Sequence, residues 1–100
     1  MTTLIKEENG NLIAEFKGRL DTAAAIQTTK DVEPLMLAEN TNIILDCTDL
    51  EYISSSGLRI FIGILKNSKA KGGQVTVKNI NEEISKVFQM TGFNKLFNII

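Results

Sequence analysis

The stretch from Asn42 to Gly73 constrains the fold of this chain more than any other part of the sequence. It opens with an apolar run, Ile43 to Leu45, that is too short for a free-standing helix and rich in β-branched side chains. Such a run predicts a strand buried on both faces. An acidic segment from Asp46 to Glu51 follows, which we expect to form a turn, and then three serines, Ser54 to Ser56. The serines therefore lie shortly beyond a buried strand.

After Gly57 the sequence changes to the period of an amphipathic helix. Apolar residues recur at three- and four-residue steps until Gly72-Gly73 ends the pattern. The first turn of a helix has amide groups without partners and the positive end of the macrodipole. A serine hydroxyl there can cap the helix. A phosphate there is stabilised both by the free amide groups and by the positive end of the helix dipole. From position alone the serines are more often caps than regulatory phosphorylation sites.

Before this stretch the sequence predicts a hairpin and a capped helix. Asn9-Gly10 separates two strand-like runs, 3–8 and 11–17, and this dipeptide favours a tight β-turn. We expect Gly18 to break the second strand. Asp21 precedes a run of alanines and predicts a helix cap, and Pro34 should kink or break the helix that follows.

After Gly73 the pattern continues with a strand, a helix and a short final strand. Val75 and Val77 alternate with polar residues, Asn81 precedes a helix that ends at Gly92, and residues 93–100 contain a turn and a strand. The predicted order is β-β-α-β-α-β-α-β. A hairpin followed by alternating strands and helices implies a mixed sheet with right-handed crossovers.

The composition excludes several classes of function. A chain of 100 residues predicts one domain, 1–100. The absence of histidine excludes Ser-His-Asp and Cys-His catalysis, and a single cysteine, Cys47, cannot build a zinc site. A net charge of −1 gives no reason to expect nucleic acid as a partner. There is no signal peptide and no long apolar run, so we expect no membrane partner and a cytoplasmic location, which suits an unpaired cysteine.

The residues around the serines resemble the STAS domain of anti-sigma-factor antagonists. The family pattern is Asp-Leu, two residues, a hydrophobic residue and Asp-Ser-Ser/Thr-Gly-Leu, and this chain has Asp49-Leu50, Tyr52 and Ser54-Ser55-Ser56-Gly57-Leu58. Three further family motifs occur in order and at the right spacing: Gly18-Arg19-Leu20-Asp21, Lys71-Gly72-Gly73 and Phe88-Gln89-Met90-Thr91-Gly92-Phe93. The resemblance therefore covers nearly the whole chain.

This resemblance implies an α/β fold, the STAS fold, with a small mixed sheet and helices packed mainly on one side. It also implies a partner switch. The unphosphorylated antagonist binds an anti-sigma factor that is also a serine kinase, and this frees the sigma factor to act in transcription. The kinase then phosphorylates and releases the antagonist, and a phosphatase reverses the modification. The chain would be a kinase substrate and a binding partner, without enzyme activity or cofactor.

The family's phosphoacceptor lies two residues before the glycine, which is Ser55 here, with Ser56 as the alternative. The resemblance suggests a partner-binding surface with these members: Asp21, Asp49, Ser54, Ser56, Gly57, Leu58 and Arg59. We expect Ser56 to be the helix cap, Ser54 a turn residue and Leu58 part of the core. Two features depart from the family: Ser54 stands where most members have Asp, and the chain ends at Ile100 where many continue into a further helix.

A second function class stays open. The chain could be a constitutive STAS interaction subunit of a transport or signalling assembly, with serines that are never modified. An enzyme with Ser55 as its nucleophile would lack a base within the motif.

Overall fold

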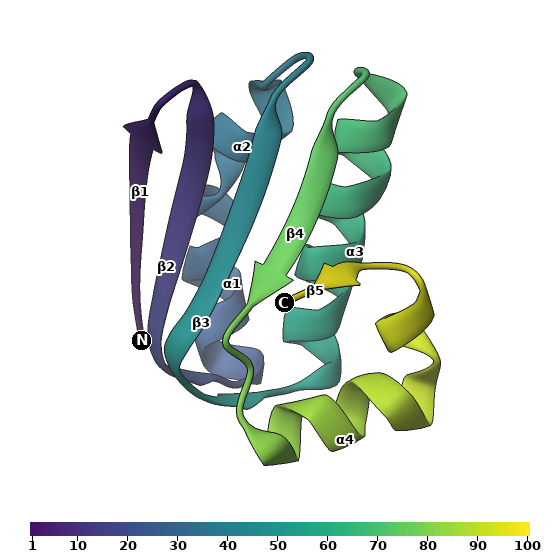
Figure 1. The fold of residues 1–100 in the computed structure, drawn as a ribbon. Helices are drawn as coiled ribbons and strands as arrows, with labels where there is room; N and C mark the ends of the chain where they lie inside the picture. The colour runs from purple at the N-terminus through teal and green to yellow at the C-terminus, as the bar shows by residue number, and fades with distance from the viewer.

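The computed structural model describes all 100 residues as five strands and four α-helices, in the predicted order except that two helices, α1 and α2, stand where one was predicted. The strands are β1 (Thr2–Glu8), β2 (Asn11–Leu20), β3 (Asn42–Ile53), β4 (Gln74–Lys78) and β5 (Asn98–Ile99). The helices are α1 (Thr22–Asp31), α2 (Glu33–Leu37), α3 (Ser55–Ala70) and α4 (Glu82–Thr91), with a 3₁₀ turn at Phe93–Lys95. Helices α1, α2 and α3 lie along one face of the sheet and α4 crosses one end of it (Figure 1).

The sheet is mixed, as predicted. Its strands lie in the order β1-β2-β3-β4-β5, with β1 antiparallel to β2 and every other neighbouring pair parallel. The hairpin turns at Asn9 and Gly10, whose φ angles of 53° and 82° are the positive values that a tight hairpin turn requires. The predicted break at Pro34 also occurs, because α1 ends at Asp31 and Pro34 lies in the first turn of α2.

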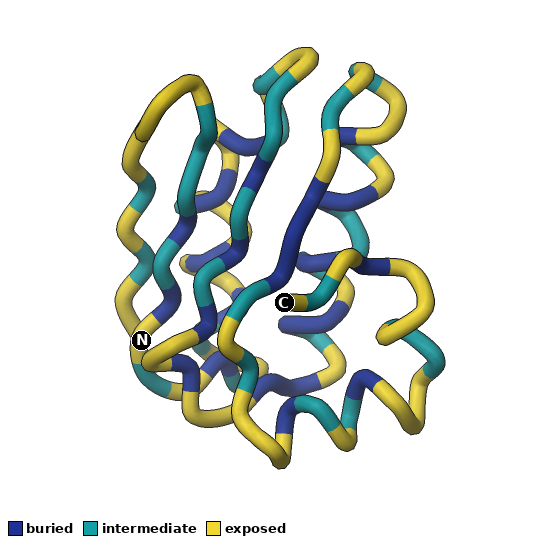
Figure 2. The backbone as a smooth tube through the Cα atoms, viewed as in Figure 1, coloured by how far each residue is buried: buried dark blue, intermediate teal, exposed yellow.

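The helices cover only one face of the sheet, and the core lies between. Figure 2 shows buried residues on the inner strands and on the helices that pack against them. On β3, buried positions alternate with half-buried ones from Ile43 to Cys47. Ile43 and Leu45 are fully buried, but Ile44 between them is half-buried. The prediction that this strand is buried on both faces is therefore wrong, since no layer covers its second face.

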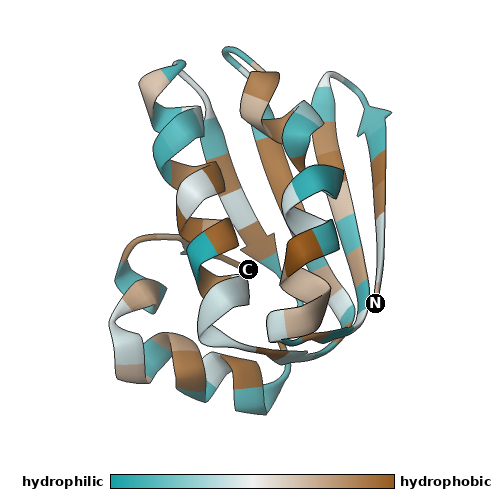
Figure 3. Cartoon of the chain, turned by 180° about the vertical axis from the view of Figure 1, so that it is seen from behind, coloured by the Kyte–Doolittle hydropathy of each residue, from teal (hydrophilic) through white to brown (hydrophobic).

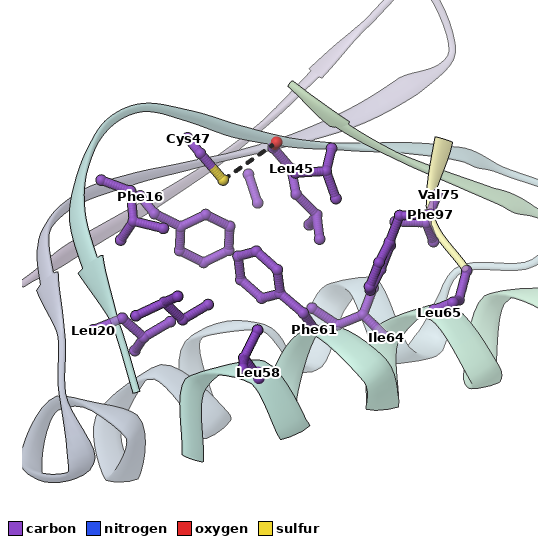
Figure 4. Close-up of a cluster of buried hydrophobic side chains, with 14 of the residues drawn as sticks. Phe16, Leu20, Leu45, Cys47, Leu58, Phe61, Ile64, Leu65, Val75 and Phe97 are labelled. Atoms are coloured by element: carbon purple, nitrogen blue, oxygen red, sulfur yellow. Dashed lines mark hydrogen bonds between the residues drawn. The ribbon is translucent and has the colours of Figure 1, made fainter. Parts of the chain in front are cut away.

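Four aromatic rings connect the sheet to the helix layer and to the C-terminal segment. Phe16 on β2 lies 5.2 Å from Phe61 on α3, Phe61 lies 6.5 Å from Phe88 on α4, and Phe88 lies 5.8 Å from Phe97, all between ring centroids. Figure 4 shows Phe16 and Phe61 facing each other across the core, with Phe97 further along α3. Such tilted and edge-on pairs add to the burial energy of the rings, so this row fixes α3 and α4 against the sheet.

The segment from Asp46 to Glu51 is a strand and not the predicted turn. Asp46 is the last residue of β3 that pairs with β4, and the residues after it extend β3 along β2 alone, where Asp49 and Glu51 reach solvent. Two register shifts in this half of β3 mark bulges, and one of them lies beside Gly18, which has a φ of 104°. Gly18 thus lies within β2, opposite the bulge at Glu51 of β3, and does not end the strand, contrary to the prediction.

The first of these bulges is accompanied by hydrogen bonds to the Asp46 carboxylate. Its Oδ1 accepts from the Thr48 N–H at 3.0 Å and from the Thr48 hydroxyl at 2.6 Å. Partial burial would raise the pKa of Asp46, but these hydrogen bonds, with Lys78 and Asn79 nearby, hold the pKa below its usual value. Asp46 therefore stays ionised and ties the bulge together.

Cys47 is fully buried in the core next to this bulge, where it packs as a small apolar side chain. Burial, with a smaller contribution from the Asp46 charge, raises the pKa of its thiol to about 12. We expect a thiol reagent at pH 8 to modify the folded protein at least a hundredfold more slowly than the urea-unfolded chain, since the thiolate is the reactive form. Because Cys47 is the single cysteine, mass spectrometry reads this directly. Equal rates in both states would contradict the buried position.

Gly57 on α3 allows the start of this helix to approach the sheet closely. A Cβ added there would lie 2.7 Å from Leu20 Cγ and 2.8 Å from Ile53 Cγ1, both inside the core. Gly57→Ala should therefore lower the free energy of unfolding by about 1–3 kcal/mol, because overpacking outweighs the better helix propensity of alanine. Urea unfolding measures this.

Gly63 on the same helix is the matched control. A Cβ there would meet only the flexible end of Met36 at 3.4 Å. Gly63→Ala should be neutral or stabilising by up to about 1 kcal/mol. If both variants unfold at the same urea concentration, the core accepts a methyl group at position 57, and the expected clash with the sheet is wrong.

Candidate functional site

The candidate site is the beginning of α3, where β3 ends and the three serines follow. Ser54 has extended backbone angles, and its Oγ accepts a hydrogen bond from the Gly57 N–H at 3.2 Å. Its own N–H donates to the Leu20 carbonyl oxygen at 2.9 Å, which ties the end of β2 to the helix start. Ser54 is therefore the N-cap of α3 and is buried, with 7 % of its surface exposed.

The predicted roles of two serines are wrong. Ser56 was expected to cap the helix and Ser54 to be a turn residue, but α3 begins at Ser55, two residues earlier than a cap at Ser56 would require. The reason is local: β3 runs without a break to Ile53, so Ser54 is the last extended residue and takes the cap position.

Ser55 is the first residue of α3 and is exposed, whereas Ser56 is half-buried beside it. The N–H groups of the first turn lack acceptors within a helix. Here the cap uses the Gly57 N–H, and the Leu58 N–H bonds to the Ser54 carbonyl oxygen at 2.9 Å. Neither of these hydrogen bonds involves the Ser55 hydroxyl, which is exposed to solvent at the positive end of a sixteen-residue helix.

The other predicted surface residues divide into an exposed and a buried group. Asp49 and Arg59 are exposed, on β3 and α3 respectively. Asp21 is half-buried and caps α1, with its Oδ1 accepting from the Ala24 N–H at 2.8 Å. Gly57 and Leu58 lie below the surface against the sheet, as does Ser54, and Leu58 belongs to the core as expected. These three residues do not reach the surface themselves, but they fix the position of the start of α3 against the sheet.

The end of the molecule that carries Ser55 is acidic on one side. An open hollow of about 630 Å³ lies between the end of β3 and the start of α4, and its charged lining residues are Asp49, Glu51, Glu82 and Glu83. The Asn81 side-chain amide donates to the Leu50 carbonyl oxygen at 3.2 Å and so holds α4 in place there. No group of three or more histidine, cysteine, aspartate and glutamate side chains is placed to hold a metal ion.

Two features of the site were not predicted from the sequence. The first is a groove of about 460 Å³ between α1 and α3, with Ile26, Ile60 and Arg59 in its wall. Figure 3 shows these two helices side by side over the sheet. The second is the Arg19 guanidinium, which stacks 4.4 Å above the Tyr52 ring on the opposite sheet face. The register that pairs Arg19 with Tyr52 depends on the bulges of β3, which no simple sequence pattern signals.

The chain matches one known class of protein domain. The sequence model of the STAS domain family matches residues 3–100, so this chain belongs to the STAS domain family. The relatives to which it is similar include several anti-sigma factor antagonists. It is 24% identical over 95 residues to the anti-sigma-B factor antagonist of Bacillus subtilis, a match that covers 95% of this chain and 86% of that protein.

Solved structures agree with this assignment. A putative anti-sigma factor antagonist from Thermotoga maritima superposes with a TM-score of 0.88 at 25% identity, over 97% of this chain and 84% of that one. The Bacillus cell fate determinant SpoIIAA in its phosphorylated form superposes with a TM-score of 0.74 at 20% identity, over 99% of this chain and 91% of that one. The second likeness concerns the fold. In this chain no helix is both long and apolar enough to cross a membrane.

The position of the cap can be tested by removing each hydroxyl in turn. Ser54→Ala should destabilise the protein by about 1 kcal/mol, because the Gly57 N–H loses its acceptor in a buried position. Ser56→Ala should change the free energy of unfolding by less than about 0.5 kcal/mol. Thermal and urea unfolding of both variants measure the difference, and a larger loss in Ser56→Ala would contradict the assigned cap.

Proposed function

We propose that this chain is an anti-sigma-factor antagonist that is switched by phosphorylation of Ser55. Unphosphorylated, it binds an anti-sigma factor that is also a serine kinase; phosphorylated at Ser55, it is released, and a phosphatase restores the binding form. The single observation that carries the proposal is the placement of Ser55. Its hydroxyl is exposed at the first position of a long helix, whereas the neighbouring Ser54 hydroxyl is buried and engaged in the cap.

The placement suits a modification that changes binding and leaves the fold intact. A phosphate on Ser55 adds a charge of about −1.5 to −2 at neutral pH. At a helix N-terminus this charge meets free amides and a favourable dipole, so the folded state tolerates it. For a binding partner, the same phosphate adds bulk and negative charge to a segment in which Asp49 and Glu51 come a few residues earlier in the sequence.

We propose that the partner contacts Asp21, Asp49, Ser56 and Arg59 around Ser55. The buried residues Ser54, Gly57 and Leu58 act indirectly, because they set the height and direction of the helix start. Direct catalysis by Ser55 has no support, because the chain has no histidine to act as its base and both neighbours in sequence, Ser54 and Ser56, carry only hydroxyl groups. In this proposal the protein acts in the cytoplasm as a substrate of the kinase and as its binding partner.

Incubation with the cognate anti-sigma kinase and ATP tests this proposal. Intact-protein mass should rise by one phosphate in the wild type and in Ser56→Ala, and should stay unchanged in Ser55→Ala. Phosphorylation should weaken the complex several- to a hundredfold, the range of a typical coupling free energy of 1–3 kcal/mol, as measured by calorimetry. Ser55→Ala should bind like the wild type.

Other outcomes separate the alternatives. If the two proteins bind but no phosphate appears, the chain is a constitutive STAS interaction subunit, a class that the neutral Ser54 in place of the usual Asp also admits. If Ser55→Ala is still modified and Ser56→Ala is not, the acceptor is Ser56.

A further inference from the structure

We propose that Arg59 binds the phosphate of phosphorylated Ser55 across one turn of α3, and that it is the specific counter-ion of the modified site. This inference rests on the proposed function, because it concerns the same serine. It adds a residue that the phosphoacceptor pattern does not contain: the motif ends at Leu58, one position earlier.

The helix geometry places these two residues together. Ser55 and Arg59 are four positions apart in α3, and both are exposed. Residues at this spacing are neighbours on a helix surface, with Cβ atoms about 6 Å apart. The Cα–Cβ bonds of a helix tilt toward its N-terminus, so a long side chain at position 59 reaches back over the turn that contains Ser55. An anion placed N-terminal to a cation is also the more favourable order for such a pair.

Arg59 is free to take this role. Both ion pairs of the structure involve Lys6 on β1, so no carboxylate holds the Arg59 guanidinium. It is the one charged residue in the wall of the groove between α1 and α3, and the first turn of α3 contains no acidic residue. The nearest carboxylate on α1 is its cap, Asp21, whose Oδ1 already accepts from the Ala24 N–H.

The other arginine near this end of the molecule is placed differently. Arg19 points to the sheet face opposite α3 and stacks on Tyr52 with its guanidinium carbon 4.4 Å from the ring centroid. Lysines on α3 begin at Lys66, three turns beyond Ser55. Of these side chains, Arg59 is thus the one that can reach a phosphate on Ser55 and has no other charged partner. Its guanidinium can bind two phosphate oxygens at once.

Binding of the phosphate by Arg59 would also change the groove. With the guanidinium drawn to Ser55, the groove wall loses its charge and keeps apolar residues such as Ile26 and Ile60. Phosphorylation would then alter two parts of the surface through one residue: it adds a phosphate at Ser55 and withdraws a cation beside it.

The test uses full-length protein with phosphoserine placed at position 55 during translation, so no kinase is needed. Phosphorus NMR over a pH series gives the second pKa of the phosphate. We expect Arg59→Gln to raise this pKa by about 0.5 unit, because the dianion loses its counter-ion. Arg59→Lys should give a smaller rise, since the charge remains and the two-pronged geometry is lost.

Arg19→Gln is the matched control, because it removes the same charge at the same end of the molecule. The remaining charges near the site, Asp21, Asp49, Glu51, Glu82 and Glu83, are common to all variants. The proposal is overturned if Arg59→Gln leaves the phosphate pKa unchanged or if Arg19→Gln raises it equally. Failure of a kinase to modify Ser55 would remove the proposed switch but would not affect this measurement.

Discussion

The orientation of α3 about its own axis is the constraint on which the site depends, and it is set where the helix meets the ends of β2 and β3. Gly57 packs so closely against Leu20 and Ile53 that a Cβ atom at this position would clash with both side chains. The Ser54 N–H donates a hydrogen bond to the Leu20 carbonyl oxygen. With positions 54, 57 and 58 turned inward, the period of the helix turns positions 55 and 59 outward. The accessibility of Ser55 is therefore a consequence of core packing.

The same packing separates the site from the stability of the domain. Phe61 continues the inward face of α3 and stands between Phe16 and Phe88, so the helix is held along its length by rings from β2 and α4. The outward face of the first turn carries none of these contacts. A group added to Ser55 would meet solvent and free amides and would leave the core contacts of α3 in place.

Much of this arrangement could be predicted from the sequence, and the failures have a common cause. Periodicity and turn residues predicted the element order, the hairpin at Asn9-Gly10 and the break at Pro34, because these signals act locally. The predictions for Asp46 to Glu51, Gly18 and Ser54 were wrong because each residue's conformation is decided by a neighbouring strand. Once pairing with β2 extends β3 to Ile53, the bulges, the Arg19–Tyr52 stack and the cap at Ser54 follow from that pairing. The local sequence pattern of a segment does not show which strand will pair with it, so these features could not be predicted from the pattern.

The serine at the cap position changes the electrostatics of the residue next to it. An aspartate cap, which most of the family has at this position, would place a carboxylate directly before the phosphorylated residue, and the two negative charges would repel each other. Ser54 satisfies the same Gly57 N–H without a charge. In this chain a phosphate on Ser55 would therefore face one fewer negative charge and would not share Arg59 with the cap. If Ser55 is phosphorylated as proposed, the serine at position 54 would lower the electrostatic cost of that state, while the packing around Gly57 that exposes Ser55 would stay the same.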